Sequence, residues 1–224
     1  DQPRSRGLGD VYKRQEYGNV TTEFEIDPNG ANVGKAQEYL AAAGYPNGEG
    51  FPELDLLYYE SGSMSQIAEA VQQMWKENLG ITVNLKVEEY AVFANTINSG
   101  NYTLSMTGWS ADYNDPMTML SLFTANGMND ARWRYKEYAG VPEDTTLNPE
   151  NEAYDNAVIM ASKTTGEERD GYLMQAEKVL MDEMVICPIY YATYTQVIDY
   201  GKVAGPGRTP IGQWDFQYYT VLGN

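Results

Sequence analysis

The sequence predicts an α/β fold, because segments with a strand pattern alternate with segments that have a helix pattern. Residues 81–88 alternate between apolar and polar side chains, the period-two pattern of a half-buried strand. Residues 63–79 instead repeat apolar side chains at helical spacing and are followed by Gly80, a common helix stop. The chain has 224 residues, of which 42% are hydrophobic, so it can bury a proper core.

The first half of the chain divides at strong stop signals. Gly44, Gly80 and Gly100 can each end a helix with a left-handed residue, and Pro46 prevents continuation after the first of them. In order, we expect a helix at 32–43, a strand at 54–59, a helix at 63–79, a strand at 81–88, a helix at 90–98, a strand at 102–108 and a helix at 117–124. Helices between strands favour an open α/β sheet, in which ligands bind at the carboxyl ends of strands.

The second half begins with a long irregular stretch, residues 125–149, which is rich in Asn, Asp, Gly and Pro. Two helices are expected next, and the second follows a capping box formed by Thr165 and Glu168. The apolar run 185–191 then predicts a central strand buried on both faces. A turn-rich segment at 205–210 leads to a last aromatic strand at about 214–221.

Composition excludes several classes of function. The net charge of −17 and the absence of a basic stripe argue against a nucleic-acid partner. The chain has no histidine and only one cysteine, Cys187, which excludes Ser-His-Asp and Cys-His catalysis, histidine-containing metal sites and an intramolecular disulfide. The longest strongly apolar run, 184–192, contains Pro188 and is far shorter than a membrane-spanning helix. We therefore expect no cofactor, no metal and no membrane-spanning segment.

Residues 1–15 differ from the rest of the chain. They hold four of the 15 basic residues and lack apolar periodicity, and the letters GDVYKRQ look like a translated adaptor sequence from a cloning step. We treat this segment as non-native and expect the chain to start in the middle of a longer protein.

The segment GWSADYNDP, residues 108–116, carries the candidate site. It places Asp112 between the aromatic residues Trp109 and Tyr113, in a loop after an apolar strand. A carboxylate held between two rings, in a lower dielectric than water, gains most by pairing with a cation that brings hydrogen-bond donors. The α-amino group of a peptide is such a cation. The alternative is that Asp112 only caps the helix that opens near Pro116.

Several motifs in the same order resemble the C-terminal part of the oligopeptide-binding proteins of ABC importers, the family-5 extracellular solute-binding proteins. They are AQEYLAAAGYPNGEGFPEL, LDLLYY, IAEAVQQMWKENLGITVNL, GWSADYNDP, NPENEAYDNAV, EERDGYLMQAEKVLMDE and ICPIYY. The resemblance implies a two-lobed fold of the periplasmic-binding-protein type II class. It implies that residues 16–193 form the second lobe and that residues 194–224 return to the first lobe.

The resemblance also implies a binding site. In peptide-binding members, the aspartate that matches Asp112 pairs with the N-terminal ammonium of the ligand, and the residue that matches Trp109 lines the same cavity. Ser110 and Tyr113 flank this aspartate. Where the best-known members use basic side chains to receive the ligand's C-terminal carboxylate, this chain has Met64, Ile97 and Met106, and Lys86, Arg132 or Arg134 could substitute. The predicted ligand-binding residues are Asp112, Trp109, Ser110, Tyr113, Met106 and Met64.

The function implied is capture of oligopeptides between two closing lobes, for delivery to the membrane subunits of an ABC importer, without enzymatic activity. The resemblance further implies a monomer that is periplasmic or held at the cell surface, lipid-anchored in the full-length protein. Two alternatives stay open. The same fold could bind an oligosaccharide, a metal chelate or another small solute, or the carboxylates Glu88, Glu89, Asp112 and Asp115 could serve a glycoside hydrolase.

Overall fold

The structure is a computed structural model that describes residues 30–127, 131, 133, 148–190, 197–205, 207 and 216–222. The chain forms two compact units, which are described separately. The sheet unit contains the described residues within Glu25–Gly108 and Ala125–Glu152. The helical unit contains the described residues within Trp109–Thr124 and Ala153–Asn224.

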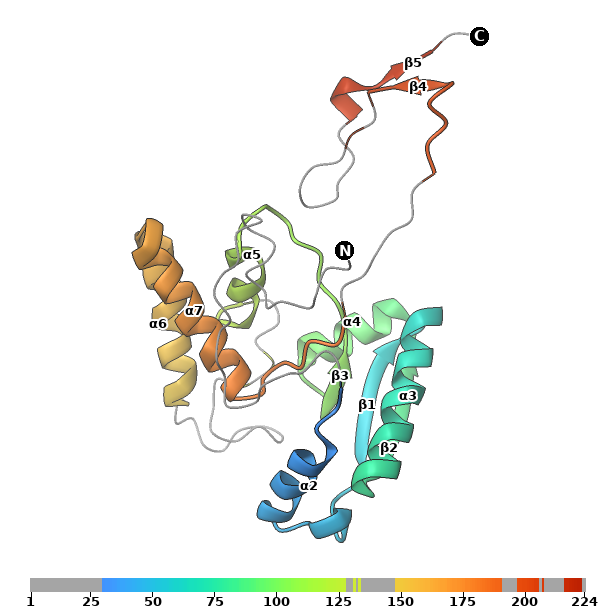
Figure 1. Ribbon diagram of the computed structural model, residues 1–224, viewed down its shortest axis with the longest axis vertical. Helices are drawn as coiled ribbons and strands as arrows, with labels where there is room; N and C mark the ends of the chain where they lie inside the picture. The colour runs from blue at the N-terminus through green and yellow to red at the C-terminus, as the bar shows by residue number, and fades with distance from the viewer. Residues whose placement is uncertain are drawn as a thin grey trace. The chain divides into compact units, whose positions relative to one another are not determined.

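The sheet unit is built on three parallel strands. They are β1 (Leu54–Tyr59), β2 (Val83–Glu88) and β3 (Leu104–Met106), in the order β2-β1-β3. Helix α3 (Gly62–Leu79) connects β1 to β2, and helix α4 (Tyr90–Ser99) connects β2 to β3 (Figure 1). Such crossovers are required because parallel neighbours cannot be joined by a tight turn. The β-α-β-α-β order expected from the sequence is confirmed.

The central strand β1 is buried on both faces. Leu56, Leu57 and Tyr58 are consecutive and all buried, as expected for a parallel strand with helices on each side. One face contributes to the core cluster of Leu56, Tyr58, Met64, Ala68, Val83 and Met106. At the end of the strand, the Tyr59 ring contacts the rings of Tyr90 and Phe93 on α4, each with a centroid distance of 5.3 Å.

Helix α2 (Val33–Ala42) and the turn after it dock against the end of α3. Asn32 caps α2 by accepting the backbone N–H of Lys35 at 3.0 Å. The 3-10 turn η1 (Pro46–Gly48) then approaches Gly80, the left-handed cap of α3, so closely that a Cβ on Gly80 would lie 2.3 Å from the Asn47 carbonyl oxygen. Only glycine permits both this approach and the positive φ of 73°.

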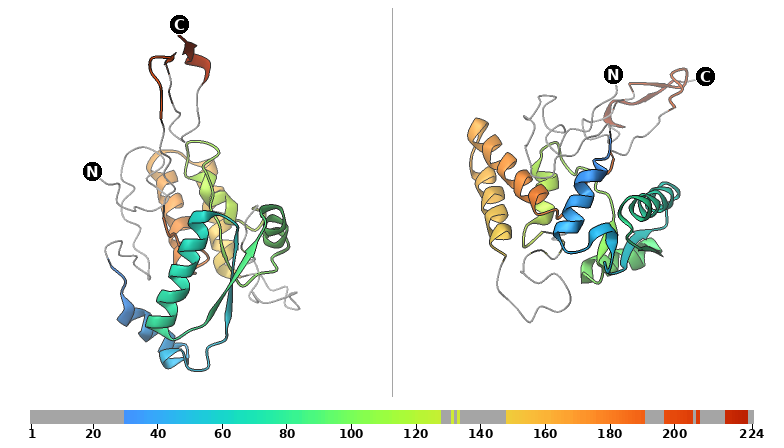
Figure 2. Two further views of the ribbon diagram at one scale, coloured as in Figure 1. Left: turned by 90° about the vertical axis from the view of Figure 1, so that its right-hand side faces the viewer. Right: turned by 60° about the horizontal axis from the view of Figure 1, so that its bottom comes forward.

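The helical unit contains α5 (Met117–Leu120), the 3-10 turn η2 (Ser121–Phe123), most of α6 (Pro149–Lys163) and α7 (Gly166–Asp182). Helices α6 and α7 lie side by side in Figure 1 and in the right-hand view of Figure 2. Their buried apolar side chains recur at helical spacing and include Tyr154, Ala157, Val158 and Ala161 on α6, with Leu173, Ala176 and Leu180 on α7. Strands β4 (Val203–Ala204) and β5 (Thr220–Val221) pair antiparallel, and a 3-10 turn, η3 (Phe216–Tyr218), precedes β5.

Several expectations differ from the structure. The last aromatic strand expected at about 214–221 is limited, within the described residues, to β5, because residues 216–218 form the 3-10 turn η3. The described residues 185–190 form no strand, and Cys187 is exposed. The expectation of a central strand at 185–191, buried on both faces, is therefore wrong for these residues. An apolar run becomes a strand only where another strand pairs with it, and none does within the described residues. Strand β3 is shorter than expected because it pairs only with Leu56–Tyr58 of β1. Thr165 precedes α7 in an extended conformation, but its side chain makes no capping hydrogen bond.

Candidate functional site

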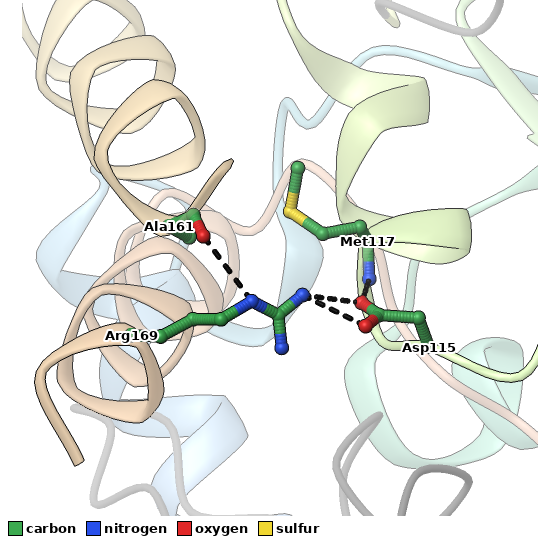
Figure 3. Close-up of polar contacts among 4 residues, drawn as sticks. All are labelled: Asp115, Met117, Ala161 and Arg169. Atoms are coloured by element: carbon green, nitrogen blue, oxygen red, sulfur yellow. Dashed lines mark hydrogen bonds and ion pairs between the residues drawn. The ribbon is translucent and has the colours of Figure 1, made fainter. Parts of the chain in front are cut away.

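The loop that follows β3 is fixed at its far end by Asp115, within the helical unit. Nη2 of Arg169 donates to Oδ1 and Oδ2 of Asp115, at 2.6 and 2.8 Å (Figure 3). The same Oδ1 accepts the backbone N–H of Met117 at 2.9 Å, in the first turn of α5. A single carboxylate therefore caps α5 and forms a charge-assisted pair with α7.

Arg169 also joins this contact to α6. Its Nε donates to the carbonyl oxygen of Ala161, in the last turn of α6, at 3.2 Å (Figure 3). The side chains of Arg169 and Asp115 are only 15% and 23% exposed, so water screens this pair less than it screens a surface pair. One guanidinium thus ties α7, α6 and the start of α5 together.

The candidate anchor, Asp112, lies three residues before Asp115 and makes two other contacts. Its backbone N–H donates to Oγ1 of Thr118, which is 2% exposed, at 2.9 Å. Its carboxylate accepts a hydrogen bond from Nε1 of Trp109, at 3.2 Å. The expected contact between Asp112 and Trp109 is therefore present. Asp112 does not cap α5, because Asp115 does so instead.

The carboxylate of Asp112 has no cationic partner among the residues that the structure describes. Asp112 and Ser110 are exposed, and the exposed fractions of Trp109 and Tyr113 are 38% and 49%. The expected low dielectric around Asp112 would thus require further atoms to cover the loop. Within the described chain, the side chains of Ser110 and Tyr113 make no polar contact. The loop can offer an accepting carboxylate together with two aromatic surfaces.

Met64 and Met106 have a different environment. Both belong to the sheet unit, where Met64 is in the first turn of α3 and Met106 ends β3. Both are buried in the core cluster, with exposed fractions of 7% and 6%. In this structure they pack in the core, and their contact with a ligand stays a prediction.

A second buried contact holds the other end of α5. The hydroxyl of Tyr154, on α6, donates to the carbonyl oxygen of Leu120. Burial raises the pKa of Tyr154, and the charges of Asp155 and Glu177 raise it further. Tyr154 is therefore a neutral donor over the physiological pH range.

No sequence pattern pointed to Arg169, which lies 54 residues from Asp115. A local signal for Asp115 was available, because an Asp directly before a proline at a helix start is a frequent cap. Nothing local marks the arginine that completes the contact.

The structure describes one of the three basic residues that could receive the C-terminal carboxylate of a ligand. Lys86 lies 3.8 Å from Asp55 Oδ2 in an exposed ion pair, whereas Arg132 and Arg134 lie outside the described residues. Within the described part of the chain, no three His, Cys, Asp or Glu side chains gather in a way that could hold a metal ion. No helix there is both long and apolar enough to cross a membrane.

Comparison with known proteins shows to which family the chain belongs. Residues 10–130 match the sequence profile described as "Bacterial extracellular solute-binding proteins, family 5 Middle". The chain is 33% identical over 174 residues to the oligopeptide-binding protein OppA of Bacillus subtilis, covering 75% of this chain and 29% of that protein. It is 35% identical over 167 residues to the periplasmic murein peptide-binding protein MppA of Escherichia coli, covering 73% of this chain and 28% of that protein.

Solved structures agree with these matches. The structure of E. coli MppA aligns with a TM-score of 0.59 and 30% identity, over 73% of this chain and 30% of that one. A periplasmic oligopeptide-binding protein of Borrelia burgdorferi aligns with a TM-score of 0.55 and 32% identity, over 71% of this chain and 30% of that one. This chain thus spans about 30% of the length of its relatives. The chain belongs to the bacterial extracellular solute-binding proteins of family 5 and has their α/β, periplasmic-binding-protein type II fold.

Proposed function

We propose that this chain forms part of the peptide-binding cleft of an extracytoplasmic receptor that serves an ABC importer, and that Asp112 pairs with the N-terminal ammonium of the peptide. The observation that carries this proposal is the contrast between two acids in one loop. Asp115 is paired with Arg169, whereas Asp112 is exposed and has no cationic partner in the described chain. Asp112 is thus the acid that is available to a ligand.

The chemistry of a general peptide receptor supports the same assignment. Peptides of different sequence share only a main chain and charged ends, so affinity must come from these groups. An ammonium offers three donors, and the Asp112 carboxylate can accept them while it keeps its hydrogen bond from Trp109. Trp109 and Tyr113 then offer aromatic surface beside the ammonium, and Ser110 a hydroxyl. Met64 and Met106 remain predicted ligand contacts of lower priority, because both are core residues in this structure.

Closure of two lobes would bury the ion pair between Asp112 and the ligand ammonium, and burial would increase its contribution to affinity. An exposed pair contributes little, but removing one partner of a desolvated pair costs about 2–5 kcal/mol. The closed form would be stabilised by ligand contacts to both lobes, and the membrane subunits would recognise it. We further propose a periplasmic or cell-surface location, with a lipid anchor on the full-length protein. We also propose a monomer without enzymatic activity.

Titration calorimetry on a complete solute-binding protein that carries this chain tests the proposal. Short peptides are first screened by thermal shift, and the tightest binder is then titrated. Asp112→Ala and Asp112→Asn should each weaken its affinity by roughly 30- to 5000-fold. Glu168→Gln, which removes one exposed acidic charge from α7, is the matched control and should change affinity by less than about twofold. Unchanged affinity in both Asp112 variants would refute the ammonium anchor.

One relative keeps a different cargo under consideration. The E. coli protein YgiS, 27% identical over 174 residues, is described as a probable deoxycholate-binding periplasmic protein. The thermal-shift screen should therefore include bile acids and oligosaccharides beside peptides. Stabilisation by one of these and by no peptide would favour a non-peptide solute.

A further inference from the structure

We propose that Arg169 is a positioning residue for the ligand site, acting through Asp115 to hold the loop that presents Asp112. This inference rests on the proposed role of Asp112 and adds the device that keeps its carboxylate in place. No residue of α7 was among the predicted site residues, and Arg169 itself makes no hydrogen bond or ion pair with Asp112.

A connection through the backbone of α5, with hydrogen bonds at both of its ends, links Arg169 to Asp112. Arg169 Nη2 donates to the carboxylate of Asp115, and Oδ1 of that carboxylate accepts the N–H of Met117 (Figure 3). The next residue, Thr118, is buried in α5, and its Oγ1 accepts the N–H of Asp112. The backbone of Asp112 is thus attached to the same short helix that the ion pair fixes.

Helix α5 is too short to be stable by itself. Helix α5 has four residues, far fewer than an isolated helix needs to be stable in water. Its conformation must therefore come from contacts outside it, and the Arg169–Asp115 pair supplies one at its start. The bond from Arg169 Nε to the Ala161 carbonyl oxygen holds the guanidinium in the orientation that meets Asp115.

The loop that presents Asp112 has few packed contacts of its own. Ser110, Asp112 and Tyr113 are exposed, and the Asp112 carboxylate has only the hydrogen bond from Trp109 among the described residues. Exposed loop backbone with few packed contacts opens easily. Without the fixed end at Asp115, the loop would populate forms in which Asp112 is displaced. A ligand would then bind only the fraction of molecules that keeps the competent form.

The test combines ligand affinity with hydrogen exchange in the complete solute-binding protein. In Arg169→Gln, peptide affinity should fall by roughly 5- to 30-fold, because affinity follows the fraction of molecules with an ordered loop. Exchange of the Asp112 amide should accelerate by at least that factor, because exchange follows the open fraction, which is small in the wild type. In the Asp112→Asn background, the same Arg169→Gln change should alter affinity by less than about twofold, because the anchor it positions is gone.

Two further variants separate positioning from general destabilisation. Lys178→Gln removes a cation from the same helix, where Lys178 pairs with Asp182, and should leave both affinity and Asp112 exchange unchanged. Asp115→Asn loses the charge that meets Arg169 but keeps an oxygen that can accept the Met117 N–H, so it should reproduce the effects of Arg169→Gln. Asp115→Asn replaces Arg169→Gln in the test if Arg169→Gln does not fold.

Distinct results would overturn the two proposals. The positioning role is wrong if Asp112 exchange stays at the wild-type rate in Asp115→Asn and Arg169→Gln. It is equally wrong if the affinity loss from Arg169→Gln is undiminished in the Asp112→Asn background. If Asp112→Asn alone leaves affinity unchanged, the ammonium anchor fails, and the exchange measurement still decides whether Arg169 orders the loop.

Discussion

The hydroxyl of Tyr154 offers a test of how the helical unit holds α5. Tyr154 is fully buried, and its hydroxyl donates to the carbonyl oxygen of Leu120, which is 1% exposed. Tyr154→Phe keeps the ring and its packing but leaves that carbonyl without this donor in a site that water does not reach. An unsatisfied buried polar group costs about 1–3 kcal/mol. For a chain of this size, each kcal/mol corresponds to roughly 2–4 °C in Tm.

The pH dependence makes the prediction sharper. Burial raises the pKa of Tyr154 above its ordinary value of 10.0, so the folded protein keeps the phenol neutral at a pH where the unfolded chain ionises it. The stability that this group contributes is present below about pH 10 and is lost as pH rises above that value. The wild type should therefore lose about 1.4 kcal/mol per pH unit relative to Tyr154→Phe above pH 10.

Urea unfolding of wild type and Tyr154→Phe at pH 7 and at several values above 10 measures both effects. Tyr172→Phe is the matched control, because Tyr172 is a half-buried residue of α7 whose hydroxyl makes no hydrogen bond to the described residues. It should cost less than about 0.5 kcal/mol. Equal stabilities of wild type and Tyr154→Phe at pH 7, or a difference that stays constant up to pH 12, would contradict this account.

Two further predictions concern the sheet unit and the helix starts. Gly80→Ala should destabilise the chain by clearly more than Gly44→Ala: both have positive φ, which costs about 1–2 kcal/mol, but only at Gly80 would a Cβ meet backbone atoms, at 2.3 Å. Equal changes in the free energy of unfolding would show that the close approach to Asn47 is not formed. Asn32→Ala should cost about 1 kcal/mol, since its side chain caps α2, whereas Thr165→Ala should cost only a few tenths, since Thr165 makes no capping bond. The reverse order in thermal unfolding would refute these two cap assignments.

The sequence was most informative where local chemistry decides the structure. Gly80 and Gly100 end α3 and α4 in the left-handed conformation, as expected from their positions after apolar periodic segments. Strand β1 has the expected bounds, Leu54–Tyr59, because it is the central strand and pairs along its whole length with β2. The helix ends depend on residues close together in the chain, which is why stop signals could predict them. The apolar run of β1 predicted a strand correctly because a partner strand is present along its whole length.

Features that depend on distant partners were less predictable. The run 185–191 has the composition of a buried strand, but residues 185–190 pair with no strand in the described chain. Thr165 and Glu168 have capping-box spacing, yet the side chain of Thr165 makes no capping bond. In both cases the local pattern permits a structure that the surroundings do not complete.

In the site, too, contacts between nearby residues were predictable and contacts between distant residues were not. Sequence reasoning identified Asp112 and its contact with Trp109, which lies only three residues away. It left the capping role open for Asp112, while the structure gives that role to Asp115. The partner of Asp115 is Arg169, on a helix far along the chain, and no spacing rule relates the two. Most of the irregular stretch expected at 125–149 lies outside the described residues, and so does all of the segment 1–15. Both expectations stay predictions.

The most direct test of the central claim compares one peptide in two forms, with a free and with an acetylated N-terminus. Acetylation removes the positive charge that Asp112 is proposed to bind and leaves the rest of the peptide unchanged. Calorimetry on the complete receptor should give roughly 30-fold or greater weakening on acetylation, and the ratio between the two forms should fall toward one in Asp112→Asn. Equal affinities of the two forms for the wild-type protein would contradict the account.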